Sequence, residues 1–285
     1  MAAIDIILAT FNGEKYIIQL IESIMSQTYR DFILIVRDDG STDNTITILK
    51  NYANRYQGKI IIIESNHQTY GVCQNFAFLL NLSTADYIMF CDQDDVWLPS
   101  KIKDTFETMK KMESQYPNMP VLVHTDLTVV DDQLNIITNS MWTHQNVDLS
   151  IEQNVYKIAM HNVVTGCSIM INKLAKQCAM PIPSEALMHD WWIAINTCKY
   201  GKICHIPKST VLYRQHLNNT IGAKQKNILF YMIKLLDIKE FIDHNFKKYK
   251  MIKKLRFKLH PLLLIIHEFR LIAISLISAL NKVQR

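Results

Sequence analysis

Small polar and acidic side chains gather at three places in the first third of this 285-residue chain. Residues 10–13 are TFNG, residues 38–43 are DDGSTD and residues 92–95 are DQDD. Carboxylates that lie close together repel one another, so such a group needs a positive charge beside it. Because ligand sets made only of oxygen favour hard cations, the clusters predict an Mg²⁺ or Mn²⁺ ion that also binds substrate phosphates.

Each cluster follows a short apolar run with the character of a buried strand, at residues 4–9, 32–36 and 87–91. Apolar residues at helical spacing come between these runs, over 13–26, 43–56 and 72–82. Strands that alternate with helices predict an α/β fold with a mostly parallel central sheet and helices on both faces. Ligands bind beyond the carboxyl ends of strands in such sheets, so we expect the three clusters to meet at one edge.

Each cluster taken alone has a plainer interpretation. An Asp-Asp-Gly-Ser segment is also typical of a turn that caps a helix. An isolated Asp-x-Asp is common in sequences without any metal. The order of the clusters, each after a buried strand, favours one joint site.

The second half carries weaker signals. Residues 121–124, 167–171 and 210–213 predict strands, 99–112 and 191–200 predict helices, and 126–149 predicts an irregular, loop-rich insert. The six cysteines form no C-x-x-C pair, which favours free thiols in a reducing compartment. The first residues show neither a basic segment nor a long apolar one, so no signal peptide is predicted and a cytoplasmic location is expected.

Over residues 4–222 the sequence resembles the family-two inverting glycosyltransferases of the GT-A fold. The segments FCDQDDVW at 90–97, HDWW at 189–192 and YRQH at 213–216 are similar to its rhamnosyltransferase-like branch. The resemblance implies a Rossmann-like GT-A sheet and transfer of a sugar from a nucleotide-diphosphate donor. The implied reaction moves L-rhamnose from dTDP-rhamnose to a cell-surface polysaccharide or lipid-linked glycan, with UDP-hexose and UDP-N-acetylhexosamine donors left open.

The resemblance also implies roles for single residues and an organisation. Residues 1–98 would form the nucleotide-sugar half, 99–222 the acceptor-binding and catalytic half, and 223–285 a C-terminal helical extension. Asp38 would accept the N3–H of uracil or thymine, and Asp94 would bind the metal directly. Arg214 would bind a phosphate, His216 would complete the metal shell, and Asp92 would contact the ribose or a metal-bound water. The other residues implied to line the donor site are Thr10, Phe11, Asn12, Glu14, Asp39, Ser41 and Gln93.

An inverting transfer needs one base that takes the proton of the acceptor hydroxyl, and Asp190 is the candidate. Its neighbours Trp191 and Trp192 would raise its pKa by desolvation and offer a flat face to the acceptor sugar. The family usually has Glu-Asp where this chain has His189 and Asp190, so His189 is an orienting partner or an alternative base. In the other interpretation Asp190 caps a helix and the two indoles belong to the core.

The charge is unevenly distributed. From Lys224 onward there are 14 Lys and Arg against 4 Asp and Glu, a net of +10, whereas the preceding part has a net of −5. The stretch 261–280 is strongly apolar, but His267, Glu268 and Arg270 interrupt it. The tail therefore predicts a helical anchor that lies on the anionic inner face of the cell membrane, not a membrane span.

The sequence also bears on other partners and other classes of protein. A helical hairpin that packs on another protein or a second copy also fits the tail, whereas no stacking or groove-reading motif accompanies the basic segment to favour nucleic acid. A nucleotidyltransferase would need a Gly-rich phosphate loop with a lysine, which does not follow residue 9. An inactive glycan-binding module is disfavoured by the intact carboxylates Asp92, Asp94 and Asp190. No G-x-G-x-x-G follows the first strand, so a dehydrogenase is disfavoured.

Overall fold

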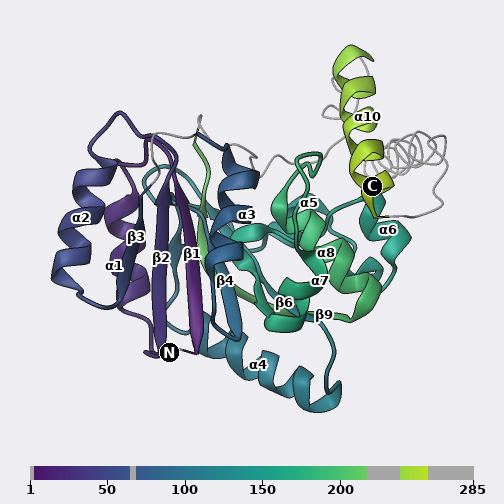
Figure 1. Cartoon of the computed structure of the whole chain (residues 1–285), viewed down its shortest axis with the longest axis horizontal. Coiled ribbons are helices and arrows are strands. Elements are labelled where there is room, and N and C mark those ends of the chain that lie inside the picture. Colours follow the sequence, from purple (N-terminus) through teal and green to yellow (C-terminus); the bar gives the residue numbers. More distant parts are fainter. Residues whose placement is uncertain (1–2, 65–68, 217–237, 256–285) are drawn as a thin grey trace, which may run out of the picture.

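A computed structural model of the chain describes residues 3–64, 69–216 and 238–255. Within these residues one sheet has the strand order β3-β2-β1-β4-β8-β6-β9-β5, and β7 pairs with β6 (Figure 1). The strands are β1 Ile4–Thr10, β2 Phe32–Asp38, β3 Ile60–Ile63, β4 Tyr87–Cys91, β5 Val96–Trp97, β6 Val121–Val130, β7 Ile136–Thr138, β8 Met170–Asn172 and β9 Lys202–Arg214.

Helices connect and cover these strands. They are α1 Ile17–Met25, α2 Thr45–Arg55, α3 Val72–Leu82, α4 Lys101–Gln115, α5 Met141–Gln145, α6 Val155–Met160, α7 Lys173–Ala179, α8 His189–Tyr200 and α10 Ile238–Lys254, with short 3₁₀ turns η1 Leu149–Ile151 and η2 Gly166–Ser168. β1, β2, β3 and β4 are parallel, β8 is antiparallel to both β4 and β6, and β9 is parallel to β6. The mostly parallel α/β sheet predicted from the sequence is therefore confirmed.

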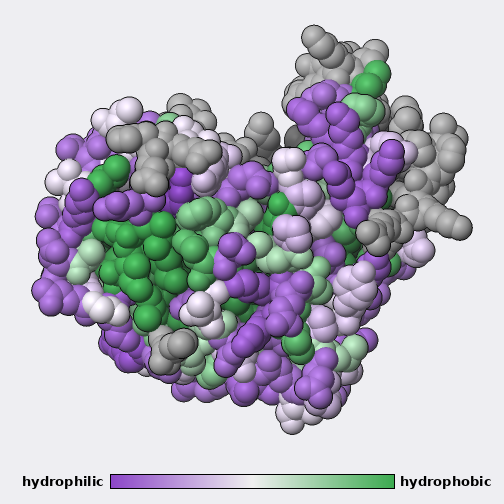
Figure 2. Space-filling view, viewed as in Figure 1, coloured by the Kyte–Doolittle hydropathy of each residue, from purple (hydrophilic) through white to green (hydrophobic). Residues whose placement is uncertain are grey.

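The two faces of the sheet bury separate apolar clusters, as the two-residue period of strands requires. On β1, Ile6 and Leu8 pack with α1, α2 and α4, whereas Ile7 packs with α3, α7 and α8 on the other face. Each such buried side chain contributes about 1.5–3 kcal/mol. An apolar area over β1 to β3 remains at the surface in Figure 2, where Ile61 is 43% exposed.

The region 126–149 is more regular than predicted. β6 runs on to Val130 and pairs with β9 over its whole length, so β9 has 13 residues where only 210–213 was expected. The full length of β6 and β9 was not predicted because buried polar residues interrupt the apolar pattern of these strands. The hydroxyl groups of Thr125 on β6 and Thr210 on β9 form a hydrogen bond of 2.6 Å, and the Asp126 carboxylate accepts from the amide of Trp142.

Helix α10 is the described part of the C-terminal extension, and it packs beside α6 and α8 (Figure 1). Lys248 Nζ donates to the Met160 carbonyl at 3.2 Å, Lys254 pairs with Glu185 at 2.8 Å, and Met251 is buried. None of the described helices is long and apolar enough to cross a membrane. The predicted apolar stretch 261–280 lies outside the described residues.

Candidate active site

The ends of β1 and β2 are joined through the carboxylate of Asp38. Its Oδ2 accepts from Thr10 Oγ1 at 2.8 Å and Ser41 Oγ at 2.6 Å, and its Oδ1 accepts from the amides of Gly40 and Ser41 at 3.0 and 2.7 Å. Gly40 has a φ of +95°, which favours glycine. Asp38 is buried with all four lone-pair positions in use, so a nucleobase contact would replace one of these bonds.

The residues that follow β1 also hold the start of α2. The Asn12 amide donates to Ser41 Oγ at 2.7 Å, and the Gly13 amide donates to Thr45 Oγ1 at 2.8 Å. Glu14 Oε2 accepts from the amide of Asn44 at 2.9 Å. These expected nucleotide-pocket residues therefore lie at the predicted edge with their polar groups engaged in holding the loops together.

Asp39 forms a buried ion pair with Arg37 at 2.8 Å. It also accepts from the amides of Tyr70 and Gly71, both at 2.7 Å, and the Arg37 guanidinium lies 4.1 Å from the centre of the Tyr70 ring. Asp39 therefore anchors the segment that enters α3.

Gln93 connects the end of β4 to the end of β1. Its Oε1 accepts from the Phe11 amide and its Nε2 donates to the Phe11 carbonyl, both at 2.9 Å. A Cβ atom added to Gly13 would lie 2.5 Å from Gln93 Oε1, so any other residue at position 13 would displace the end of the Gln93 side chain. Phe11 itself stays 51% exposed at the edge of the site.

Asp94 and His216 meet as predicted, with His216 Nε2 2.8 Å from Asp94 Oδ2 and only 13% and 16% of the two side chains exposed. The His216 ring stacks on Tyr16 at 4.9 Å. Arg214 Nε donates to the Asp94 backbone carbonyl at 2.9 Å, so this arginine positions the loop from a buried place. A carboxylate oxygen beside an imidazole nitrogen fits an Mn²⁺ or Mg²⁺ ion that keeps further positions for phosphate.

Asp92 and Asp95 face inward beside Cys167, and their ligand atoms lie within 4.8 Å of one another. Burial, followed by the charges of Asp94 and Asp190, raises the pKa of Asp92 to about 7. Burial and the charges of Asp94 and Asp92 also raise the pKa of Asp95 well above its usual range. These carboxylates accept too few hydrogen bonds to offset their burial, so they favour a cation nearby.

A buried lysine lies behind this cluster. Lys101 begins α4 with no exposed surface, and burial lowers the pKa of its ammonium to about 8. Lys101 was not anticipated from the sequence, whereas Asp95 belongs to the predicted cluster at 92–95. The available signal was the spacing of 101, 102, 105 and 109 along the buried face of α4, which includes the lysine.

Asp190 lies at the start of α8. Its Oδ2 accepts from the Gly166 amide at 2.9 Å and its Oδ1 from the Trp191 amide at 2.6 Å. Burial outweighs these bonds and raises the pKa of Asp190 to about 6. The carboxylates of Asp190 and Asp92 both lie next to the turn η2, since Gly166 donates to Asp190 and the next residue, Cys167, has its sulfur within 4.8 Å of an Asp92 oxygen.

His189 is packed between Phe76 and Phe90, at ring distances of 4.1 and 5.3 Å. Neither ring nitrogen has a hydrogen-bond partner within the described residues, and burial lowers the pKa of His189 to about 3. At neutral pH the ring is uncharged and too weakly basic to take a proton. This favours Asp190 over His189 as the base.

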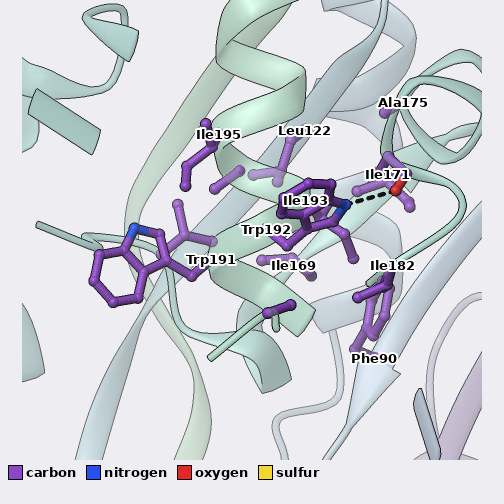
Figure 3. Close-up of a cluster of buried hydrophobic side chains, with 14 of the residues drawn as sticks. Phe90, Leu122, Ile169, Ile171, Ala175, Ile182, Trp191, Trp192, Ile193 and Ile195 are labelled. Atoms are coloured by element: carbon purple, nitrogen blue, oxygen red, sulfur yellow. Dashed lines mark hydrogen bonds between the residues drawn. The ribbon is translucent and has the colours of Figure 1, made fainter. Parts of the chain in front are cut away.

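The expected acceptor face of Trp191 and Trp192 is corrected by the structure. Both indoles are buried, and their Nε1 atoms donate to the carbonyls of Ile158 and Ala179 at 2.6 and 2.7 Å. Figure 3 shows Trp192 within the apolar cluster around β8 and α8, and Trp191 at its border. Because α8 is buried on every side of its first turns, neither indole is available to stack on a sugar.

A mostly parallel α/β sheet with acidic side chains at the carboxyl ends of its strands agrees with the nucleotide-sugar transferases of the GT-A class. The sequence profile of "Glycosyl transferase family 2" matches residues 5–178, and the chain belongs to this family. It is 29% identical to the dTDP-rhamnosyl transferase RfbG of Shigella flexneri over 224 residues, which is 76% of this chain and 74% of the relative.

Solved structures share the fold. Residues 1–349 of TarS from S. aureus, in complex with UDP-GlcNAc, superpose with a TM-score of 0.60 at 16% identity, covering 96% of this chain and 71% of that one. The mannosyltransferase PcManGT from Pyrobaculum calidifontis, in complex with GDP-Man and Mn²⁺, gives a TM-score of 0.59 at 13% identity, covering 98% and 75%. These neighbours are GT-A glycosyltransferases, so the GT-A fold predicted from the sequence is confirmed.

Proposed function

We propose that this glycosyltransferase transfers one sugar, with inversion, from a nucleotide-diphosphate donor to an acceptor hydroxyl. The observation that carries the proposal is that two further carboxylates accompany the metal-compatible pair Asp94 and His216, since Asp92 lies beside Cys167 and Asp190 accepts from the amide of the residue that precedes Cys167. The acceptor oxygen forms a bond to the anomeric carbon while the bond between that carbon and the diphosphate oxygen breaks. Asp190 takes the acceptor proton, and the nucleoside diphosphate leaves.

The donor-side residues have distinct tasks in this proposal. Asp94 and His216, with Asp92 beside them, would hold a divalent ion, which would stabilise the charge of the leaving diphosphate. Arg214 keeps Asp94 in place through the backbone. Phe11 and Asp38 lie at the same edge, where a nucleobase can be accommodated.

The sharpest form of the donor is dTDP-L-rhamnose, supported by the similarity to a dTDP-rhamnosyl transferase. A UDP-hexose or UDP-N-acetylhexosamine is the alternative, since a structural neighbour was solved with UDP-GlcNAc. A thermal-shift screen of dTDP, UDP, GDP and their sugars, with and without Mn²⁺, tests both. Mn²⁺-dependent stabilisation by dTDP and dTDP-rhamnose is expected. If only UDP compounds stabilised the protein, the proposed donor would change to a UDP-sugar. If no nucleotide or nucleotide-sugar stabilised it, the transferase proposal would be contradicted.

We further propose that the protein binds an anionic membrane surface and that its acceptor there is a lipid-linked glycan. Along α10, Ile242 and Phe246 are 59% and 53% exposed, and the exposed Lys250 and Lys253 lie on the same helix. Apolar and cationic side chains on one helix favour binding to anionic lipid. Replacing Ile242 and Phe246 by Glu should reduce cosedimentation with anionic vesicles, whereas Ile136→Glu, at a position 61% exposed on β7, should not. Equal binding by all variants would contradict this surface.

A further inference from the structure

The buried end of the carboxylate row contains a lysine that the transfer reaction does not use. Lys101 Nζ, Asp95 Oδ2 and Trp97 Nε1 are all buried, and none has a hydrogen-bond partner within residues 3–64, 69–216 and 238–255. An ammonium and a carboxylate in a dry interior are costly unless each is close to an opposite charge. These two groups therefore need an explanation.

The surroundings of Lys101 identify its electrostatic partners. The ammonium lies 4.7 Å from the centre of the Trp97 ring, a favourable position for a cation. The charge of Asp95 is among those that raise the pKa of Lys101 against the effect of burial, whereas burial raises the pKa values of the Cys167 and Cys91 thiols well above their usual range and keeps them neutral. Of these, Asp95 is a carboxylate, and its second oxygen is the one left without a hydrogen bond.

Asp95 in turn fixes the outer part of the site. Its Oδ1 accepts from the Arg214 amide at 3.2 Å. Arg214 donates to the Asp94 carbonyl, and His216 follows two residues later and contacts the Asp94 side chain. The row therefore has an inner end at Asp95 and Cys167, and an outer end at Asp94 and His216.

We propose that Lys101 is the built-in counter-cation of the inner end, so that the exchangeable divalent ion is confined to the outer end. Through Asp95, Lys101 is a positioning residue for the strand end that carries Arg214 and His216. The proposal rests on the proposed function only for the outer ion. Its tests report folding and ion binding in the absence of donor, and they can fail while sugar transfer persists.

A double-mutant cycle on the full-length, metal-free chain tests the pairing of the two charges. Lys101→Met removes the charge and keeps an unbranched side chain one atom shorter, and Asp95→Asn keeps an acceptor for the Arg214 amide. We expect Lys101→Met to lower the thermal midpoint by about 5 °C or more in the wild-type background, and by clearly less in Asp95→Asn. Equal losses in the two backgrounds would overturn the pairing. Lys103→Met, in the same helix at a side chain 56% exposed, is the matched control and should change little.

Cadmium binding provides a second measurement that needs no variant of Lys101. A vacant inner end would offer Asp92, Asp95 and the Cys167 thiolate to Cd²⁺, a thiophilic ion with an ultraviolet thiolate absorption band. With Lys101 in place, the wild type and Cys167→Ser should show the same band on titration with Cd²⁺. A wild-type band larger by one thiolate would identify the inner end as an ion site and overturn the proposal, even if every Lys101 variant failed to fold.

Discussion

The aspartates after β2 and the aspartates after β4 lie at the same edge of the sheet, but their carboxylates are compensated in opposite ways. Asp38 and Asp39 accept hydrogen bonds from loops and amides, and Asp39 also pairs with a buried arginine. Asp92 and Asp95 have few such partners, and burial raises their pKa values. Similar Asp-Asp sequences thus serve either to hold the loops or to attract a cation, and the supply of internal donors decides which.

Removal of the proposed base should give the largest effect on the rate of transfer. It would show that proton removal depends on a residue outside both aspartate pairs. Asp190→Asn is expected to lower kcat by about 10²- to 10⁴-fold, the usual contribution of a general base. Release of nucleoside diphosphate measures the rate, and isothermal titration measures donor binding. Retained donor affinity is expected, and a collapse of that affinity would instead assign Asp190 to the donor site.

On the β4 side, Asp94→Asn should lower transfer by about 10²- to 10³-fold, as when one group that stabilises developing charge is lost. The unfolding midpoint should stay near the wild-type value because Asp94 is partly exposed and its loop is held by the backbone bond to Arg214. Mn²⁺ titration in the presence of donor measures the lost affinity. Full Mn²⁺-dependent activity in this variant would remove the metal role of Asp94.

On the β2 side, Asp39→Ala should act on stability. It leaves the Arg37 guanidinium buried without its partner, which costs about 3–5 kcal/mol. Denaturant unfolding measures this loss, and activity per folded molecule should stay close to wild type. If Asp39→Ala left stability unchanged and abolished donor binding, the contrast between the two aspartate pairs would fail.

The pH profile should show the smallest effect. A base must be deprotonated, and burial raises the pKa of Asp190 from 3.8 to about 6, so kcat/KM should rise with pH up to about 6 and then level off. Below that point it should fall about tenfold per pH unit. Repeating the profile at several Mn²⁺ concentrations distinguishes the titration of Asp190 from that of the metal ligands. If the midpoint of the acidic limb shifts with the Mn²⁺ concentration, that limb reports the metal ligands and not Asp190.

The elements around the donor edge were largely predictable. β4 and α3 have the predicted bounds, and β1 and β2 continue only one or two residues further, because apolar runs and helical spacing are local signals. The meeting of Asp94 with His216, 122 residues apart, was indicated by resemblance. Local patterns could not show that Trp191 and Trp192 are buried, because their indoles bond to carbonyls of two other helices. Lys101 points inward although a lysine usually indicates an exposed position of a helix.

The contact between Gly13 and Gln93 has a consequence for the evolution of this chain. Any side chain at position 13 would displace the Gln93 amide, which bonds to both the N–H and the C=O of Phe11. Among natural relatives, a residue other than glycine at position 13 should therefore be accompanied by a smaller residue at position 93. The two sites should covary although 80 positions separate them.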